Sequence, residues 1–413
     1  MADRVPLLVA APWYPHPEVP FAGAFVASAV RAVQPFVGEV VVVHTHEQVL
    51  DMGIAEAERE RPAWLRQTAM AMAALGRVDD PAAPGAELRR VRALNPKRTN
   101  FAVTARAHRD ALRTATGSHG PHGVIDVPVV HVHVGHLTGW GAATTVSGRT
   151  RLVLSEHYTR LPRVLRTQEG RALYQQAVHR ADVVTVPGTY LANQLSRAFP
   201  WLSDRIAMIG NVVDVDAIAE RSEPVVTLDR WLYLGRLLPH KRPEAVLDAF
   251  AVYRREHRDA TLTLAGGGTE EESLRLRSAE LGLGDAVTVL GALPPEEIPA
   301  LLERHDVLVH LSSIETFGIT IAEALASGMP VVVTRCGGPE DILVDVPRDS
   351  ARVVEISDSP ETVAATVHDL ETTLAGRDAR APRALMVQRY SPDAVGRRLL
   401  ALYDDDPASG GTA

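Results

Sequence analysis

The chain has 413 residues, of which 46% are hydrophobic and 23% charged, and its formal net charge is −8. This length predicts two or three domains, and the composition excludes a disordered or fibrous protein. The acidic balance argues against nucleic-acid binding, and the single cysteine, Cys336, excludes an internal disulfide. No apolar run reaches the ~20 residues of a membrane-spanning helix, and the start, MADRVPLL, lacks a signal-peptide core. We therefore expect a cytoplasmic protein.

Short runs rich in valine, isoleucine and leucine alternate along the chain with helical patterns such as 244–256 and 270–281. Because the runs are apolar almost throughout, they are typical of strands buried on both faces of a parallel sheet. The predicted strands are 6–11, 39–45, 129–134, 151–155, 183–186 and 205–209 in the first half, and 230–234, 261–265, 287–290, 307–311, 331–334 and 351–354 in the second.

This series of strands and helices occurs twice. It predicts an α/β protein of two Rossmann-like, doubly wound domains that face each other across a cleft. The expected domains are 1–213 and 214–387, with a last helix at about 388–404 that packs back on the first domain. The acidic stretch 211–229 contains Pro224 and is predicted to be a linker or hinge.

The segment 48–123 is less regular than the rest. It contains a helical pattern at 61–77 with apolar and arginine residues, and then a basic run at 86–113 with a net charge of +6. We expect an amphipathic surface helix and a solvated basic face. The alternatives are a peripheral contact with a membrane or attraction of a phosphorylated acceptor. The polar, glycine-rich tail from Asp405 is expected to be frayed.

The stretch 312–341, SSIETFGITIAEALASGMPVVVTRCGGPED, follows the end of a predicted buried strand. A helix is expected from Ile319, after the loop that carries Glu315 and Gly318. Helix N-termini offer unpaired N–H groups to anions, so a diphosphate could bind over 318–320, with Glu323 able to accept hydrogen bonds from ribose hydroxyls. The alternative is that Glu315 only stabilises the helix N-terminus and Glu323 is merely solvated.

A second stretch, WLYLGRLLPHKR, ends another predicted strand. Gly235 permits close approach of a ligand to the backbone. Arg236 and Lys241 place two cations near the strand's carboxyl end, where doubly wound sheets bind ligands. Such cations suit a pyrophosphate, since arginine offers a bidentate fork and lysine a compact charge. Two unrelated surface cations are the alternative.

Together these stretches resemble the retaining family 4 glycosyltransferases, which have the two-domain GT-B fold. The residues that carry the resemblance are Glu315 and, after seven residues, Glu323; the sequence GGPE at 337–340; and Gly235-Arg236 with Lys241. The resemblance implies that Arg236 and Lys241 neutralise the leaving nucleotide diphosphate, a catalytic role. It also implies that Glu323 binds the ribose and that Glu315 contacts the donor sugar. The donor-binding residues that it implies are Gly23, Gly235, Gly266, Thr316, Phe317, Gly318, Ile319, Thr320 and Glu323.

The N-terminal half resembles the acceptor domain of that family. The resemblance places Gly23 in a loop near the donor phosphate and His157, in SEHYT, at the reaction centre. The acceptor-binding residues that we expect are Trp13, Tyr14, His133 and His136. A metal site formed by His131, His133 and His136 is an alternative, but two basic groups on the diphosphate make a metal unnecessary, so no metal or cofactor is expected.

The resulting hypothesis is a retaining hexosyltransferase. It would move a sugar from a nucleotide diphosphate sugar, with UDP as the expected nucleotide, to a small-molecule acceptor. The alternatives are a nucleotide-sugar 2-epimerase of the same fold, a transferase acting on a lipid acceptor at the membrane surface, and a non-catalytic nucleotide-sugar-binding protein. An NAD-dependent oxidoreductase is disfavoured, because the Gly266-x-Gly268 turn has Glu271 where the third glycine belongs. The sequence predicts no oligomeric state.

Overall fold

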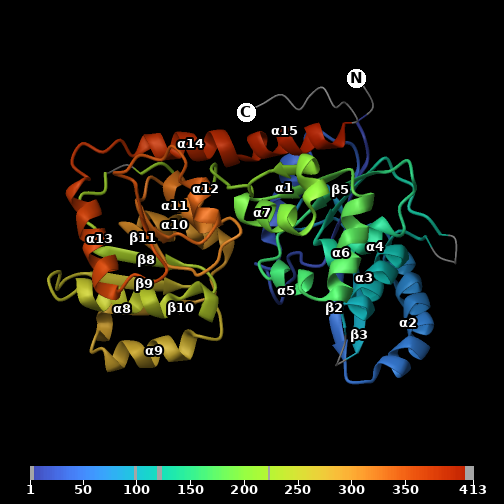
Figure 1. The fold of residues 1–413 in the computed structure, drawn as a ribbon, viewed down its shortest axis with the longest axis horizontal. Helices are drawn as coiled ribbons and strands as arrows, with labels where there is room; N and C mark the ends of the chain where they lie inside the picture. Colours follow the sequence, from blue (N-terminus) through green and yellow to red (C-terminus); the bar gives the residue numbers. More distant parts are fainter. Residues whose placement is uncertain (1–3, 97–99, 119–122, 222–223, 405–413) are drawn as a thin grey trace. The chain divides into compact units, whose positions relative to one another are not determined.

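The computed structural model describes residues 4–96, 100–118, 123–221 and 224–404. The chain divides into two compact units (Figure 1): the first contains the residues up to Asn211 and those from Val395 onward, and the second is Val212–Ala394. The tail predicted to be frayed, and Lys97 and Arg98 of the basic run, lie outside the described residues.

The first unit is built on a parallel sheet of seven strands in the order β3-β2-β1-β4-β5-β6-β7. The strands are β1 (Leu7–Ala11), β2 (Val40–Leu50), β3 (Glu87–Pro96), β4 (Val129–His133), β5 (Arg151–Ser155), β6 (Val183–Val186) and β7 (Ile206–Met208). Its helices are α1 (Ala24–Val33), α2 (Ile54–Leu75), α3 (Phe101–Ala115), α4 (Trp140–Ala143), α5 (Leu161–Leu165), α6 (Gln168–Arg180) and α7 (Thr189–Ala198), with π-helical Gly135–Gly139 and 3-10 helical Pro200–Arg205.

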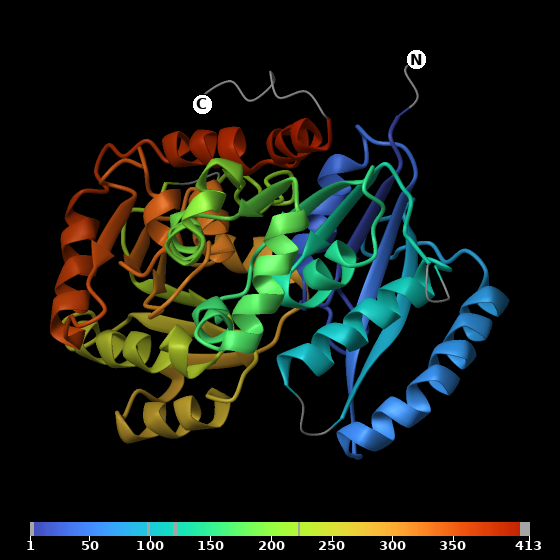
Figure 2. The same cartoon turned by 45° about the vertical axis from the view of Figure 1, so that its right-hand side comes forward.

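Strand β3 was not predicted, because it lies in the basic run. It forms the edge of the sheet, and polar residues such as Arg90 and Arg92 interrupt its apolar positions, whereas Val91 and Ala93 are buried. An edge strand is covered less completely than a central one, so its sequence lacks the continuous apolar run. Helix α2 lies beside this edge (Figure 2) and contacts both β3 and α3.

The second unit contains a six-stranded parallel sheet in the order β10-β9-β8-β11-β12-β13. The strands are β8 (Arg230–Leu234), β9 (Thr261–Ala265), β10 (Val287–Gly291), β11 (Val307–His310), β12 (Val331–Thr334) and β13 (Ala351–Val354). The helices are α8 (Pro243–Tyr253), α9 (Glu271–Glu280), α10 (Ile298–Glu303), α11 (Ile319–Ala326), α12 (Gly338–Ile342), α13 (Pro360–Thr372) and α14 (Arg380–Tyr390), with 3-10 helical Pro239–Lys241, Gly284–Ala286 and Pro295–Glu297.

Both faces of this second sheet are buried, as the apolar runs predict. Along β8, Trp231 and Tyr233 join the core beneath α8 and α13, whereas Leu232 and Leu234 join the core beneath α11 and α14. Successive side chains of a strand point to opposite faces, so a strand that is covered on both sides must be apolar at every position. The fold class predicted from the sequence, two doubly wound α/β units, is confirmed.

The stretch 211–229, predicted to be a linker, is packed on the second unit over much of its described length. Val213, Val215 and Ile218 belong to the core beneath α11, and Val225 and Leu228 belong to the core beneath α8. The apolar residues of this stretch are buried against the second unit, although its charged residues are typical of a solvent-exposed linker.

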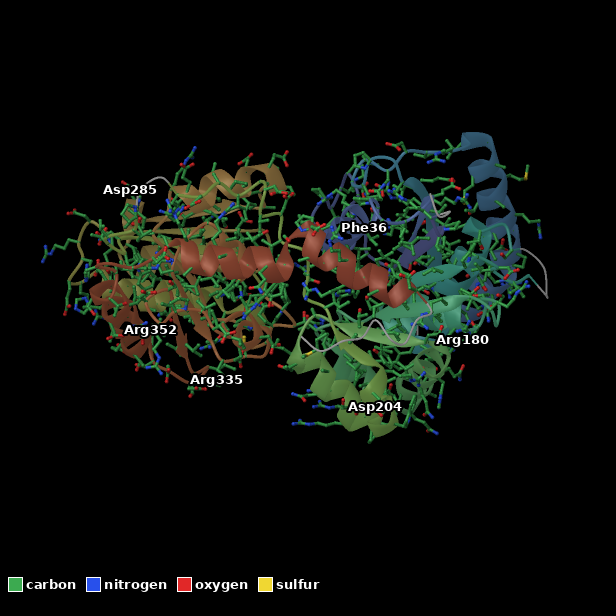
Figure 3. The ribbon with its side chains drawn as sticks, turned by 90° about the horizontal axis from the view of Figure 1, so that it is seen from above. Phe36, Arg180, Asp204, Asp285, Arg335 and Arg352 are labelled. Carbon is green, nitrogen blue, oxygen red and sulfur yellow. The ribbon has the colours of Figure 1, made fainter. Side chains whose placement is uncertain are left out.

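Helix α15 (Pro392–Tyr403) packs on the first unit from Val395 onward. Gly396 allows this contact, because a Cβ there would overlap the carbonyl oxygen of Ala32. The Arg397 guanidinium lies 5.1 Å from the ring centroid of Phe36, which is labelled beside the helix in Figure 3. No helix of the described residues is both long and apolar enough to cross a membrane.

Candidate active site

The glycine-bearing loops of the second unit meet where β8 and β9 end. Gly235 donates a backbone hydrogen bond to Ala265 (3.0 Å), and Leu237 donates one to Gly267 (3.0 Å). A Cβ on Gly266 would overlap the Gly235 carbonyl oxygen, and Gly266 has a φ of 139°. Glycine at 266 therefore lets the loop after β8, which carries Arg236, lie against the loop after β9. Both loops are at the carboxyl edge of the sheet, where doubly wound sheets bind ligands.

Lys241 and Glu315 form an ion pair at this edge of the sheet. The carboxylate also accepts hydrogen bonds from His310 Nε2 (2.8 Å) and Ser312 Oγ (3.1 Å). Burial raises the pKa of Glu315, but the charge of Lys241 and the hydrogen bond from His310 outweigh that effect and lower it to about 2. The structure thus holds a buried carboxylate in its charged form next to a cation.

The backbone of Glu315 is fixed by the loop after β12. Its N–H donates to the Cys336 carbonyl (3.2 Å), and its carbonyl accepts from Gly338 N–H (3.0 Å). The Glu340 carboxylate accepts from the N–H groups of Cys336 and Gly337, at 3.2 and 2.9 Å. The GGPE sequence therefore begins helix α12 and holds the Glu315 loop in place.

Arg236 is exposed, and the ion pairs of the described residues do not include it. Its carbonyl accepts a hydrogen bond from the Tyr233 hydroxyl (2.8 Å). The Tyr233 ring stacks on His310, with centroids 5.8 Å apart. One tyrosine therefore links the backbone that presents Arg236 to the histidine that contacts Glu315.

Helix α11 begins with free N–H groups. Gly318 adopts a φ of 101° before the first turn, no side chain caps the helix, and Ile319 and Thr320 donate no backbone hydrogen bond to another described residue. Such a terminus favours an anion. The Phe317 side chain, by contrast, is 1% exposed and packs on Tyr390, so only its backbone could face a donor.

Glu323 lies one turn inside α11 and is partly buried. Burial and the negative charge of Asp214 raise its pKa to about 7. Asp214 belongs to the stretch that was predicted to be a linker, and its influence on Glu323 was not expected from the sequence. The structure therefore indicates a carboxyl group that changes its protonation near neutral pH.

In the first unit, three of the predicted histidines form a buried stack. The rings of His131 and His133 lie 4.6 Å apart, and those of His133 and His157 lie 5.3 Å apart. His131 hydrogen-bonds Tyr403 and Ser155, both at 2.7 Å, which engages both of its ring nitrogens. Those bonds argue against the alternative metal site that includes His131. Burial lowers the pKa of His157 to about 3, so its imidazole is neutral at physiological pH.

A pocket of about 360 Å³ opens in the first unit. Trp13, Tyr14 and His136 line it. His133 does not line it, and its ring is stacked between those of His131 and His157. The Tyr14 side chain is buried, and its hydroxyl donates to Asp80. The other lining residues are Pro12, His16, Glu18, Val19, Ala22, His44, His46, Glu47, Phe101, Thr104, His108, Leu137 and Tyr158.

Two buried histidines of this pocket have a ring nitrogen without a partner among the described residues, His108 Nε2 and His136 Nδ1. Burial lowers the pKa of His108 to about 3 and that of His136 to about 4. Neutral imidazoles can donate or accept hydrogen bonds, so two unused polar groups lie in the buried wall of the pocket, beside aromatic rings. Sequence analysis missed His108, which lies on α3 without a recognisable motif.

Gly23 has a clear structural reason to be glycine. It precedes α1 with a φ of 65°, and a Cβ there would overlap the carbonyl of Trp13. Its expected role beside a donor phosphate remains a prediction, as do the roles of the other candidate residues.

Comparison with known proteins agrees with these features. Residues 214–378 match the model of the glycosyl transferases group 1, and residues 72–217 match that of Glycosyltransferase Family 4. A D-inositol 3-phosphate glycosyltransferase of Corynebacterium efficiens is 27% identical over 68% of this chain and 72% of its own length. An alpha-D-kanosaminyltransferase of Streptomyces kanamyceticus is 25% identical over 64% of this chain and 70% of its own length. A GDP-mannose-dependent phosphatidylinositol monomannoside mannosyltransferase of Mycolicibacterium smegmatis is 30% identical over 48% of this chain and 56% of its own length.

Solved structures show the same fold. HepE of Anabaena, crystallised with UDP, has a TM-score of 0.65 at 17% identity, over 96% of this chain and 98% of that one. Sucrose-phosphate synthase of Thermosynechococcus elongatus has a TM-score of 0.69 at 16% identity, over 97% and 98%. The chain belongs to the family 4 glycosyltransferases, retaining enzymes of the GT-B fold that take a sugar from a nucleotide sugar. The family and enzyme class expected from the motifs are confirmed.

Proposed function

We propose that the protein transfers a hexose from a UDP-sugar to a small-molecule acceptor, with retention of the anomeric configuration. The observation that carries the proposal is the buried Lys241–Glu315 pair at the carboxyl edge of the second sheet. It lies in the same unit as the close glycine loops and the uncapped N-terminus of α11. UDP is proposed as the nucleotide because HepE, of similar fold, was crystallised with UDP.

In this proposal, positive groups bind the leaving diphosphate. Arg236 is exposed and unpaired among the described residues, so it can form a bidentate contact with a phosphate. Lys241 would bind a second phosphate oxygen while keeping its contact with Glu315, and the N–H groups of Ile319 and Thr320 would complete the cradle. Glu323 would accept hydrogen bonds from the ribose.

The chemistry that these groups serve is cleavage of the anomeric C–O bond. As that bond breaks, its electron pair moves to the diphosphate oxygen and the sugar gains oxocarbenium character. Fixed cations stabilise the developing negative charge more than they stabilise the ground state. The acceptor hydroxyl then attacks the same face of the sugar, and its proton passes to the departing phosphate.

The proposed acceptor site is the pocket of the first unit. Trp13 and Tyr158, with ring centroids 5.6 Å apart, offer faces for a sugar or cyclitol ring. The unpartnered nitrogens of His108 and His136 suit hydroxyl groups, which both donate and accept. This combination of aromatic faces and neutral polar groups favours a polyhydroxylated small molecule.

A lipid acceptor is the second candidate, because α2 presents apolar side chains to solvent. Met70 is 74% exposed and Leu75 is 71% exposed, and the mannosyltransferase relative is named for a phosphatidylinositol substrate. Co-sedimentation with anionic vesicles tests this candidate. Binding that the double substitution Met70→Ser, Leu75→Ser abolishes would support a lipid acceptor over a water-soluble one.

A panel of nucleotide sugars in a thermal-shift measurement tests the donor, since a ligand that binds the native state raises Tm. The stabilising donor is then assayed for nucleotide release with and without candidate acceptors. Acceptor-dependent release supports a transferase. Formation of the 2-epimer of the sugar without an acceptor supports the epimerase alternative, and binding without turnover supports a non-catalytic protein.

A further inference from the structure

A second group of ligating side chains lies in the second unit, at the sheet edge opposite the proposed donor site. His257 lies in the turn between α8 and β9, and His368 and Glu371 lie near the end of α13. One ligand atom from each of the three falls within 4.8 Å of the other two. Because His257 precedes a strand of this parallel sheet, the group is at the amino edge, whereas the donor residues follow the carboxyl ends.

Helix geometry brings two of the three together. His368 and Glu371 are three residues apart on α13, so they share one face, and His368 Nδ1 is 3.9 Å from Glu371 Oε2. Helix α8 packs against α13, which brings the turn with His257 next to that face. Of the residues that the structure describes, these form the only group of three with metal-ligand spacing.

Surrounding residues hold the ligands in place. The His257 ring stacks on Tyr253, with centroids 3.9 Å apart and an interplanar angle of 8°. The Tyr253 hydroxyl donates to Glu371 Oε2 (3.4 Å), and Leu228 N–H donates to Glu371 Oε1 (3.0 Å). Metal ligands in proteins are oriented by such outer contacts.

Asp229 lies next to one of the three ligands. It precedes β8, and its Oδ1 is 3.6 Å from His257 Nδ1, an outer carboxylate contact of the kind that orients a ligating histidine. In a tetrahedral zinc site with bonds of about 2.0–2.1 Å, neighbouring ligand atoms are roughly 3.3 Å apart. The pair His368–Glu371, at 3.9 Å, thus needs to close by only about 0.6 Å.

We propose that His257, His368 and Glu371 bind one Zn²⁺ ion, with water as the fourth ligand. Two imidazoles and a carboxylate suit this borderline cation better than they suit Mg²⁺ or Ca²⁺, which take oxygen ligands. The ion links the turn after α8 to α13. Its role is to stabilise the second unit, and it takes no part in sugar transfer.

Equilibrium dialysis of the full chain against chelator-buffered Zn²⁺ tests the proposal. The wild type and the control His179→Ala, which removes an exposed histidine of the first unit, should each bind one more Zn²⁺ per chain than the double variant His257→Ala, His368→Ala. Glu371→Gln should raise the Kd at least ~10-fold. Co²⁺ in place of Zn²⁺ should give the strong visible absorption of a tetrahedral site in the wild type and the control, and not in the double variant.

Equal zinc stoichiometry in the wild type and the double variant would overturn the proposal, as would a wild type that retains no zinc. If the double variant fails to fold, the single variant His368→Ala tests the proposal instead. The His368 side chain is 59% exposed, so its loss leaves the core intact. Zinc should raise the Tm of the wild type and leave that of His368→Ala unchanged.

Discussion

Lys241 and Glu315 are 74 residues apart in the chain and form a buried ion pair. The pair keeps a cation at the carboxyl edge of the second sheet, and His310 and Ser312 hydrogen-bond the same carboxylate oxygen, Oε1, that contacts Lys241. A diphosphate that arrives next to Lys241 therefore meets an ammonium group that is already oriented. Such preorganised charge is what stabilises a leaving group without reorganisation during the reaction.

Replacing this cation should cripple turnover. Lys241→Ala removes positive charge from the leaving group, and we expect kcat to fall roughly 10²–10³-fold, as when one oxyanion-hole donor is deleted. The measurement is initial-rate kinetics of nucleotide release. Arg335→Ala, which removes an exposed arginine paired with Glu355, is the matched control and should leave kcat unchanged.

Lys241→Ala also leaves Glu315 buried without its cation, which should lower the free energy of unfolding by roughly 3 kcal/mol. The double variant Lys241→Ala, Glu315→Gln removes that buried charge and should recover most of the stability in urea unfolding, but no turnover. Near-normal turnover in the single variant would contradict the proposed donor site.

Donor binding should depend on pH through Glu323. Its pKa of about 7 means that the carboxyl group is protonated below neutral pH and loses acceptor capacity for the ribose hydroxyls. We expect the Kd for UDP, measured by calorimetry, to rise as pH falls from 8 to 6. Asp214→Asn removes a negative neighbour and lowers that pKa, so the change in Kd should move to lower pH.

Glu323 should also affect the free energy of unfolding, with a pH dependence opposite to that of donor binding. The native state keeps the Glu323 proton to a higher pH than the unfolded chain, where the carboxyl pKa is near 4.5. Its contribution to the free energy of unfolding therefore falls as pH rises from about 4.5 to 7. Urea unfolding of the wild type and Glu323→Gln across this range measures it, and parallel curves would contradict the assignment.

The acceptor pocket should respond to loss of its free nitrogens. His136→Phe keeps an aromatic ring and removes the unpartnered Nδ1, so the KM for the acceptor should rise roughly 10-fold, the loss of about one hydrogen bond. Slow hydrolysis of the donor without acceptor should not change. An unaltered acceptor KM, with His179→Ala as the control, would place the acceptor elsewhere.

Helix α15 should contribute to the stability of the first unit. Tyr403→Phe removes the hydroxyl that hydrogen-bonds His131 at 2.7 Å and leaves a buried imidazole nitrogen unpaired. The expected loss is about 1–2 kcal/mol in the free energy of unfolding.

The sequence alone was enough to predict every strand of the described residues except β3, the duplication of the α/β pattern and the family that the motifs of the second unit indicate. The runs 151–155, 183–186, 230–234, 261–265, 331–334 and 351–354 coincide with observed strands. Those inside a sheet are covered on both faces, so burial favours apolar residues at most positions and leaves a continuous local signal, whereas the edge strand 351–354 is partly exposed. The motif residues Gly235, Glu315 and Gly318 lie at strand and helix ends, where spacing in the chain also fixes position in space.

The tertiary structure decided what depends on contacts between distant segments. Edge strand β3 has a polar sequence, and only its pairing with β2 makes it a strand. Asp214 raises the pKa of Glu323, and His108 reaches the pocket from α3, because packing places them there. His257 and His368 likewise meet only through the contact of α8 with α13. Local patterns determine elements, whereas the neighbours of a side chain depend on how those elements pack.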